Sequence, residues 1–314
     1  MKITSSFLDT VPGFHYDRQR LAQISARSEN PGPLVWLTAG VHGDEVGGIV
    51  VIQEVFKRLR RQPLLRGAVC ALPLLNPLGF ETASRQVPIS QEDLNRAFPG
   101  STAGTLAQRM AHQVFQTIMA TKPTLVLDLH NDWTQSVPHT LIDPAPPELP
   151  TTAYQQLQEI AARSGFVTIL DQTVYTGTLS YTMLQHGVAA LSMELGEAYV
   201  VNERNIAIGV DSIWSMLSSL ELIAPHQPFH FEYEHRPTKS LLTYSDKPLA
   251  SATGIARFAV RPGQQVSRDQ VIARIYSPLG RLRETLRATQ DALVLGHTDY
   301  SVVFPGIAVM SFGV

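Results

Sequence analysis

A histidine and a glutamate three positions apart, His42 and Glu45, are the side chains whose spacing first suggests chemistry. They follow a hydrophobic run, residues 33–39, that ends at a glycine. Side chains three positions apart at the start of a helix lie on one side of it, so an imidazole and a carboxylate there can share a metal ion. Catalytic zinc usually takes three protein ligands. The pair is therefore half of a candidate zinc site, and a loop histidine beside a helix-start glutamate is the alternative.

A third ligand is predicted at the end of another hydrophobic run. His130 follows the run 124–129, so both ligand segments fall at the carboxyl end of a predicted strand. In open α/β sheets that edge is where ligands bind. We therefore predict one Zn²⁺ per chain, held by His42, Glu45 and His130. Asp128 lies two positions before His130 on the same side of an extended segment, where it either supports the ligand or caps the next turn.

A glutamate at a further strand end is a candidate general base. Glu194 directly follows the hydrophobic run Ala189–Met193. A carboxylate in this position can deprotonate a water that a neighbouring metal ion activates. A capping or solvated side chain is the alternative, and Glu197 competes for the same role. The position at the strand end favours Glu194.

A polar stretch that contains proline, residues 85–100, shows no helical or strand period and is predicted to be a loop. It carries Arg85 and Arg96. The planar guanidinium group suits a substrate carboxylate or a developing oxyanion, and loops above a rigid sheet often carry recognition groups. Surface pairing of these arginines with Glu92 and Asp93 is an alternative of equal weight.

The elements that must position these side chains form an α/β pattern over residues 1–225. Hydrophobic runs alternate with helical periods, which is typical of a mostly parallel or mixed sheet with helices on both faces. The predicted strands are 34–39, 68–75, 124–129 and 188–193, and the predicted helices are 46–61, 105–119, 154–163 and 203–222.

The pattern changes near residue 224. Residues 226–314 are predicted to form a proline-flanked linker, or edge strand, and then a smaller all-β domain of the barrel-sandwich type, because short strand-like runs alternate with Pro-Gly turns. Two similar halves resemble biotinyl and lipoyl carrier domains, which hold their cofactor on a lysine at a hairpin tip. No lysine follows Lys247. A structural or lid role is therefore expected in place of a carrier role.

Bulk properties narrow the class of protein. The chain has 314 residues, 44% of them hydrophobic and 17% charged, which predicts a substantial core. A net charge of -2 gives no support for a nucleic-acid partner. Cys70 is the single cysteine, so no disulfide can form within the chain, and it is predicted to be a buried strand thiol. Since no signal-peptide or membrane-spanning pattern occurs, we expect a cytoplasmic protein with a small-molecule substrate, and we leave homo-oligomerisation open.

The remaining histidines are weaker candidates. His226, His230 and His235 cluster in the predicted linker without strand-end geometry, so metal binding there is not expected. His112 is predicted to be structural on a helix. The others have no partner identifiable from the sequence: His139, His186 and His297.

Short motifs in a fixed order also carry a family resemblance. They are His42-Gly-Asp-Glu45, Asn76-Pro77, Arg85, Asp93-Leu-Asn95-Arg96, Asp128-Leu-His130-Asn131 and Glu194-Leu-Gly196. Together they resemble the succinylglutamate desuccinylase/aspartoacylase family, which are zinc amidohydrolases related to the zinc carboxypeptidases. The resemblance runs from about residue 30 to residue 225, and the C-terminal β module is also similar to that of the family. The loop from Arg85 to Arg96 is closer to the branch that deacetylates N-acetyl-diaminobutyrate.

The resemblance implies an activity and the residues that carry it. The expected reaction is zinc-dependent hydrolysis of the amide bond of a small N-acyl amino acid. His42, Glu45 and His130 are implied as zinc ligands. Glu194 is implied as the base that activates water and then protonates the leaving amine. A metallocarboxypeptidase or peptide amidase is the alternative enzyme, and a metal-free binding protein is the alternative outside enzymes.

The resemblance also implies how substrate is held. Arg85 would polarise the scissile carbonyl, and Asn95 and Arg96 would bind a substrate carboxylate. Asn131 matches a family position beside the third ligand and is taken as substrate-binding. Aspartoacylase further places a tyrosine of its C-terminal domain in the site, and the candidates here are Tyr244, Tyr276 and Tyr300.

Overall fold

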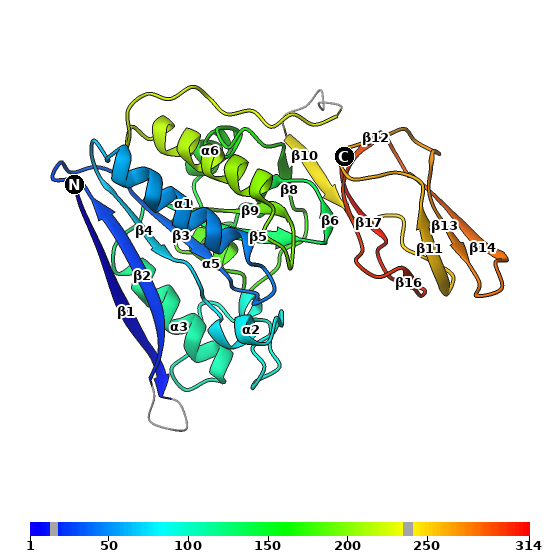
Figure 1. The fold of residues 1–314 in the computed structure, drawn as a ribbon, viewed down its shortest axis with the longest axis horizontal. Coiled ribbons are helices and arrows are strands. Elements are labelled where there is room, and N and C mark those ends of the chain that lie inside the picture. Colours follow the sequence, from blue (N-terminus) through cyan, green and yellow to red (C-terminus); the bar gives the residue numbers. More distant parts are fainter. Residues whose placement is uncertain (13–17, 235–240) are drawn as a thin grey trace.

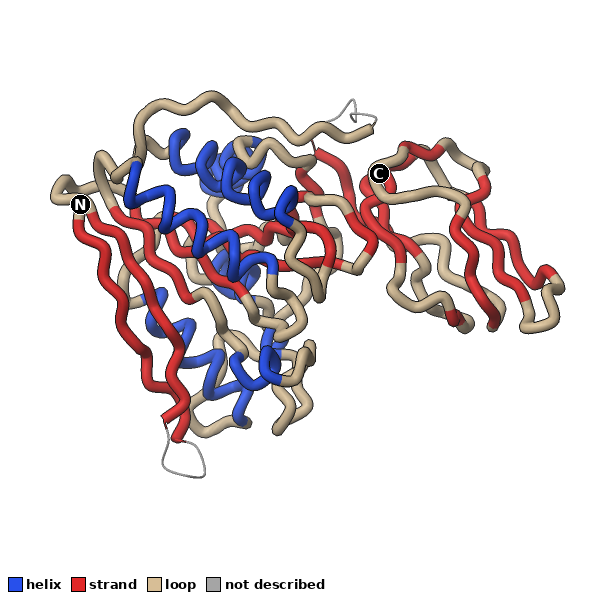
Figure 2. The backbone as a smooth tube through the Cα atoms, viewed as in Figure 1, coloured by secondary structure: helices blue, strands red, loops and turns tan. Residues whose placement is uncertain are grey.

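The predicted α/β class is confirmed by a mixed sheet with helices on both faces (Figures 1 and 2). The computed structural model describes residues 1–12, 18–234 and 241–314. Its helical segments are α1 (Gly47–Arg61), α2 (Pro77–Glu81), the 3₁₀ turn η1 (Leu94–Arg96), α3 (Leu106–Met119), α4 (Thr151–Ala162), α5 (Leu179–Gln185) and α6 (Glu203–Ser219).

The large sheet contains 13 strands within the described residues. Its order is β1-β2-β4-β3-β5-β9-β7-β8-β10-β17-β15-β12, with β6 paired to β15. The bounds are β1 (Lys2–Pro12), β2 (Arg18–Arg27), β3 (Leu34–Ala39), β4 (Ala68–Leu72), β5 (Leu125–Asp132), β6 (Gln135–Ser136), β7 (His139–Ile142), β8 (Thr168–Leu170), β9 (Ala189–Glu197), β10 (Leu241–Ser245), β12 (Gln265–Val266), β15 (Ala292–His297) and β17 (Met310–Gly313).

The centre of this sheet is parallel and buried on both faces. Strands β4, β3, β5 and β9 pair in parallel, and every residue of β4 is buried. Helices α1, α4 and α6 cover one face around a core that includes Trp214, while α3 and α5 cover the other around Trp36. Coverage of both faces explains why these strands are continuous hydrophobic runs in the sequence. Cys70 is buried in β4, as predicted.

Two of the central strands are longer than their hydrophobic runs. β5 continues to Asp132 and β9 to Glu197, so the prediction that His130 and Glu194 end their strands is wrong. The parallel pairing of β5 with β9 continues beyond the apolar residues of both strands, and His130 is in register with Glu194. The register shifts between His130 and Asp132. The two side chains therefore come from neighbouring strands at one level of the sheet.

The start of α3 is set by local hydrogen bonds. Thr105 caps α3 by accepting from the Gln108 backbone, and the Gln108 side chain accepts from the Thr105 backbone in return. This capping box satisfies two backbone donors at the helix start. The end of another helix, α1, is stabilised by charge. Its last turn carries Arg58, Arg60 and Arg61, which complement the partial negative charge of a helix C-terminus.

The C-terminal module is joined to the α/β domain by backbone pairing. β10 pairs in parallel with β8 and antiparallel with β17, and β6 pairs with β15. A second sheet of four strands completes the module, at the far right of Figure 1. Its order is β14 (Leu282–Arg287), β13 (Val271–Tyr276), β11 (Gly254–Phe258) and β16 (Val302–Val303). The division into domains 1–225 and 226–314 stays a prediction, since the large sheet runs through both.

Several elements were not predicted from the sequence. They include the N-terminal hairpin of β1 and β2 and the short strands β7 and β8. In the parts of the chain that the structure describes, no helix combines the length and apolarity that a membrane crossing requires.

Candidate active site

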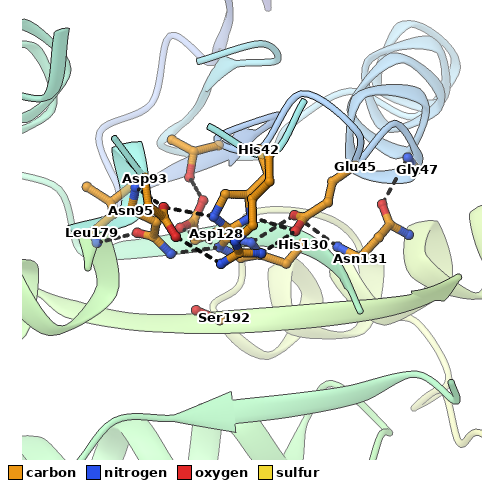
Figure 3. A network of polar contacts seen from close by, with 12 residues as sticks. His42, Glu45, Gly47, Asp93, Asn95, Asp128, His130, Asn131, Leu179 and Ser192 are labelled. Atoms are coloured by element: carbon orange, nitrogen blue, oxygen red, sulfur yellow. Dashed lines mark hydrogen bonds and ion pairs between the residues drawn. The ribbon is translucent and has the colours of Figure 1, made fainter. Parts of the chain in front are cut away.

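Three buried side chains converge at the level of the sheet where β5 and β9 pair (Figure 3). One ligand atom from each of His42, Glu45 and His130 lies within 4.8 Å of the others. Nδ1 of His42 lies 2.6 Å from Glu45 Oε1, and Nδ1 of His130 lies 2.9 Å from Glu45 Oε2. Across the described ranges, no other group of three or more His, Cys, Asp or Glu side chains comes together in this way.

The far nitrogen of each imidazole is held by a second carboxylate. His42 Nε2 lies 3.1 Å from Asp93 Oδ1, and His130 Nε2 lies 2.9 Å from Asp128 Oδ2. A neutral imidazole that donates from Nε2 keeps its lone pair on Nδ1, where it can ligate a metal. Both Nδ1 atoms face Glu45, so the donor set and its outer hydrogen bonds fit a metal ion.

The charges of the cluster are mutually stabilised. Burial disfavours ionisation of Glu45, but the imidazoles of His42 and His130 hold the pKa of its carboxyl well below the usual value. Burial likewise opposes the charge on His130, whereas Asp128 and Glu45 raise the pKa of its imidazole well above the usual value. The carboxylates around the imidazoles therefore favour a positive charge at this point, which a bound cation would supply.

Glu194 differs from the carboxylates of Glu45, Asp93 and Asp128 in its hydrogen bonding. Its Oε2 atom is buried and has no hydrogen-bond partner among the described residues. Burial raises the pKa of the Glu194 carboxyl well above its usual value, although the charge of His130 opposes the rise. An unpaired carboxylate with a raised pKa is suited to taking up and releasing a proton.

Glu197, its competitor in the sequence, is used in another way. Its Oε2 atom accepts hydrogen bonds from the side chains of Asn202, at 2.7 Å, and Asn205, at 3.1 Å. Asn202 is the N-cap of α6. Glu197 thus fixes the start of that helix, which leaves Glu194 as the candidate base.

The two arginines of the 85–100 loop reach the same site. Arg85 lies 3.0 Å from Asp93 Oδ2 and 3.7 Å from Glu45 Oε1, so the surface pair considered in the sequence forms and also faces the cluster. Arg96 donates to the backbone oxygen of Asn95 at 2.7 Å. The segment is not wholly a loop, because Asp93 caps the short turn η1.

Asparagine side chains tie the surrounding segments together. Asn95 accepts from the backbone of Leu179 at 2.9 Å and lies 3.5 Å from His130 Nε2. Asn131 accepts from the backbone of Gly47 at 3.0 Å and donates to the backbone oxygen of Glu197 at 3.0 Å. The amide of Asn131 is therefore already engaged by the protein, and a substrate contact for it stays a prediction.

The His–Glu–His cluster, Glu194, the two arginines and the two asparagines line one cavity of about 240 Å³. Every site residue predicted from the sequence belongs to its lining: His42, Glu45, Arg85, Asn95, Arg96, His130, Asn131 and Glu194. Of the three candidate tyrosines, only Tyr244 lines it. Sequence reasoning missed a set of polar lining residues beyond the cluster, namely Asp132, His139, Asp143, Asp171, Tyr175, Ser180 and Ser192.

The linker histidines lie elsewhere. His226 lines a larger cavity of about 710 Å³ between α4 and α6, together with Thr124 and Ala189 at the amino ends of β5 and β9. That cavity is at the opposite edge of the sheet from the cluster. His230 lines neither cavity, and His235 is outside the described residues.

Comparisons with known proteins identify the fold and the family of this chain. The structure resembles a metallo-carboxypeptidase from Burkholderia cenocepacia, with a TM-score of 0.57 and 17% identity over 68% of this chain and 63% of that chain. The model of the succinylglutamate desuccinylase/aspartoacylase catalytic domain matches residues 31–220, and this chain belongs to that family of deacylases.

Individual relatives support this membership. The N-alpha-acetyl-L-2,4-diaminobutyric acid deacetylase of Halomonas elongata is 27% identical over 262 residues, covering 81% of this chain and 73% of that protein. A succinylglutamate desuccinylase of Shewanella sp. (strain MR-4) is 27% identical over 190 residues, 56% of this chain and 54% of that protein. The product-bound ectoine utilization protein EutE (DoeB) of Ruegeria pomeroyi shares the fold, with a TM-score of 0.84 and 20% identity over 99% of this chain and 95% of that chain.

Proposed function

We propose that this chain is a zinc-dependent amidohydrolase that removes the acyl group of a small N-acyl amino acid. One observation carries the proposal: a buried His–Glu–His cluster shares its cavity with the unpaired carboxylate of Glu194. Membership in a deacylase family supports hydrolysis of an amide in particular.

Zinc is the metal that the donor set favours. Two imidazole nitrogens and one carboxylate are the protein ligands of the thermolysin and carboxypeptidase type of site, which leaves one position open. Zinc held by His42, Glu45 and His130 would supply a Lewis acid that polarises a carbonyl and lowers the pKa of a water to about 7.

The side chains of the cavity account for the proton transfers. Glu194 accepts a proton from the attacking water while the oxygen of that water bonds to the acyl carbon. When the C–N bond breaks, Glu194 returns that proton to the leaving nitrogen, which gives a carboxylic acid and an amine. The remaining proton of the attacking water then passes from the acid to the amine, so the products at neutral pH are a carboxylate and an ammonium ion. Arg85, whose guanidinium faces the cluster, donates to the carbonyl oxygen as negative charge develops there. Asn95 and Arg96 hold the carboxylate of the amino acid.

The proposal is tested by metal analysis combined with a substrate panel. Purified protein is expected to hold zinc at near-unit stoichiometry and to hydrolyse members of a set of N-acetyl and N-succinyl amino acids. Loss of activity on chelation and its recovery with zinc are expected as well. A protein that takes up no zinc, and gains no activity on reconstitution, would be a binding protein and would contradict the proposal.

A carboxypeptidase is the second candidate, because the structure resembles the metallo-carboxypeptidase fold. Short peptides with free carboxyl ends, assayed beside the N-acyl amino acids, separate the two activities. Cleavage of the peptides with no turnover of N-acyl amino acids would favour the carboxypeptidase.

A further inference from the structure

The strands at the edges of the two sheets differ in how they are protected from further pairing. An edge strand has one row of N–H and C=O groups that no neighbouring strand engages. Among the described residues, β6, β12 and β16 are edge strands of only two residues each. β14 is longer, but it carries Arg283 and Arg287, and its pairing with β13 shifts register twice. Short length, charge and irregular pairing are usual means of preventing an edge from pairing with another chain.

β1 has none of these protections along most of its length. It contains 11 residues and ends the large sheet beside β2, and in Figure 1 no other described segment lies outside it. Residues 3–8 include no charged residue and no proline, and their register against β2 does not shift. This part of the edge is therefore regular and can accept a further strand.

A large apolar side chain on β1 is also left without cover. Phe7 is 67% exposed, and the residue opposite it on β2 is Ala22, so only a methyl group faces the ring across the pair. Ile3 lies four positions earlier on the same face of the strand and is half-buried. A strand added beside β1 would bring apolar cover to both side chains.

We propose that β1 pairs with β1 of a second copy of this chain, antiparallel about a two-fold axis, so that the two large sheets become one. Two-fold symmetry is the commonest arrangement of soluble homo-oligomers, and it lets one edge supply both strands. Strands β2, β4 and β3 separate β1 from β5, which carries His130, so the interface lies away from the candidate active site. The inference is independent of the proposed function.

The side chains of β1 select one register. Residues directly opposite each other in an antiparallel pair point to the same face, so each residue meets one that is an even number of positions away. With the axis at Ser5, Ile3 lies opposite Phe7 of the second copy, which is a favourable pair of a β-branched and an aromatic side chain. With the axis at Ser6, Ile3 would lie opposite Asp9 instead. Phe7 would then meet a serine, so the strand is self-complementary about Ser5.

The oligomeric state of the full chain tests the interface. Sedimentation velocity over a series of protein concentrations is expected to show a dimer for the wild type. Ser5→Lys places two ammonium groups opposite each other at the axis and should raise the Kd of the dimer at least about 10-fold. Ser267→Lys, at an exposed serine of the C-terminal module, is the matched control and should keep the dimer. Circular dichroism verifies that each variant is folded.

Cross-linking tests the register. Cys70 is the single cysteine and is buried, so a cysteine introduced on β1 is the accessible thiol. Directly opposite residues of antiparallel strands lie within the reach of a disulfide, whereas diagonal neighbours do not. Ser5→Cys should therefore form a covalent dimer on mild oxidation. Ser6→Cys should not, because its two copies are diagonal neighbours in this register.

The outcomes that overturn the proposal are distinct from those that concern catalysis. A wild type that is monomeric at every concentration would overturn it, and so would a Ser5→Lys variant that dimerises as tightly as the wild type. Cross-linking of Ser6→Cys in preference to Ser5→Cys would overturn the pairing about Ser5. Neither measurement depends on turnover, so a failure of the proposed function would leave both results standing.

Discussion

Asp128 Oδ2 lies 2.9 Å from Nε2 of His130, and both side chains are buried in one strand. The sequence left Asp128 between supporting a ligand and capping a turn, and this contact favours the first. Thr38 holds the other oxygen of Asp128 by donating to Oδ1 at 2.6 Å. The orientation of the His130 imidazole is therefore fixed by hydrogen bonds on the side away from Glu45, which lead from Thr38 of β3 through Asp128 to His130 of β5.

Asp128→Asn should weaken zinc binding by roughly 10- to 100-fold, because outer carboxylates orient a ligating histidine and increase its basicity. Competition with a chromogenic chelator measures the affinity. Asp211→Asn is the control for the loss of a charge. An unchanged affinity in Asp128→Asn would mean that His130 needs no support or is not a ligand.

Glu194→Gln should keep the metal and lower kcat by roughly 100- to 10,000-fold, the usual contribution of a positioned acid–base group. Glu197→Gln is the matched control, since Glu197 lies three positions away and bonds to the start of α6. It should keep kcat. Steady-state kinetics with metal analysis of both proteins separates the roles. Near wild-type turnover by Glu194→Gln would assign the base elsewhere.

Asp143 should make stability fall with rising pH in a defined window. Burial raises the pKa of Asp143 to about 6, above its ordinary value of 3.8. Between these two pH values Asp143 keeps its proton in the folded chain and has lost it in the unfolded chain. The contribution of Asp143 to stability is therefore fully present below pH 3.8 and is lost as the pH rises through about 6. Asp143→Asn removes this loss. Its stability relative to wild type should rise by roughly 3 kcal/mol between acid and neutral pH.

Urea unfolding of metal-free wild type and Asp143→Asn at pH 4 and pH 7.5 checks this prediction. The difference between the two proteins is the informative quantity, because titration of the cluster histidines is common to both. A difference that does not change with pH would contradict the raised pKa of the buried Asp143 carboxyl.

Removal of the metal should destabilise the fold. A ligand at 1,000 times its Kd stabilises the native state by about 4 kcal/mol, so a chelator should lower Tm by several degrees. Differential scanning calorimetry with and without chelator measures the shift. His130→Ala should lose the response to both chelator and zinc. The same shift in His130→Ala as in the wild type would place the bound metal at another site.

Part of this site can be predicted from the sequence because it follows long hydrophobic runs. His42 and His130 come shortly after such runs, and the carboxyl ends of neighbouring parallel strands meet at one edge of a sheet, which is enough to predict that the two imidazoles lie together. Asp143 and Asp171 obey the same rule, yet they follow β7 and β8, which have only four and three residues. Runs that short give no reliable period.

Other features of the site depend on contacts between distant segments. Asp93 was considered as a partner of an arginine, and the structure adds His42 as its second partner. Tyr244 enters the cavity from β10 because that strand pairs with β8, some 70 residues earlier in the chain. No local pattern in the sequence indicates that pairing, although the resemblance to aspartoacylase included Tyr244 among three candidates.

The pairing of β10 with β8 also bears on aggregation of the chain while it folds. If the chain ended after α6, β8 would present a row of unpaired N–H and C=O groups at the rim of a large sheet. Such an open rim is a template for strands of other molecules and leads to aggregation. The C-terminal module closes this rim. A truncated catalytic domain should therefore precipitate on expression even though each of its predicted metal ligands is present.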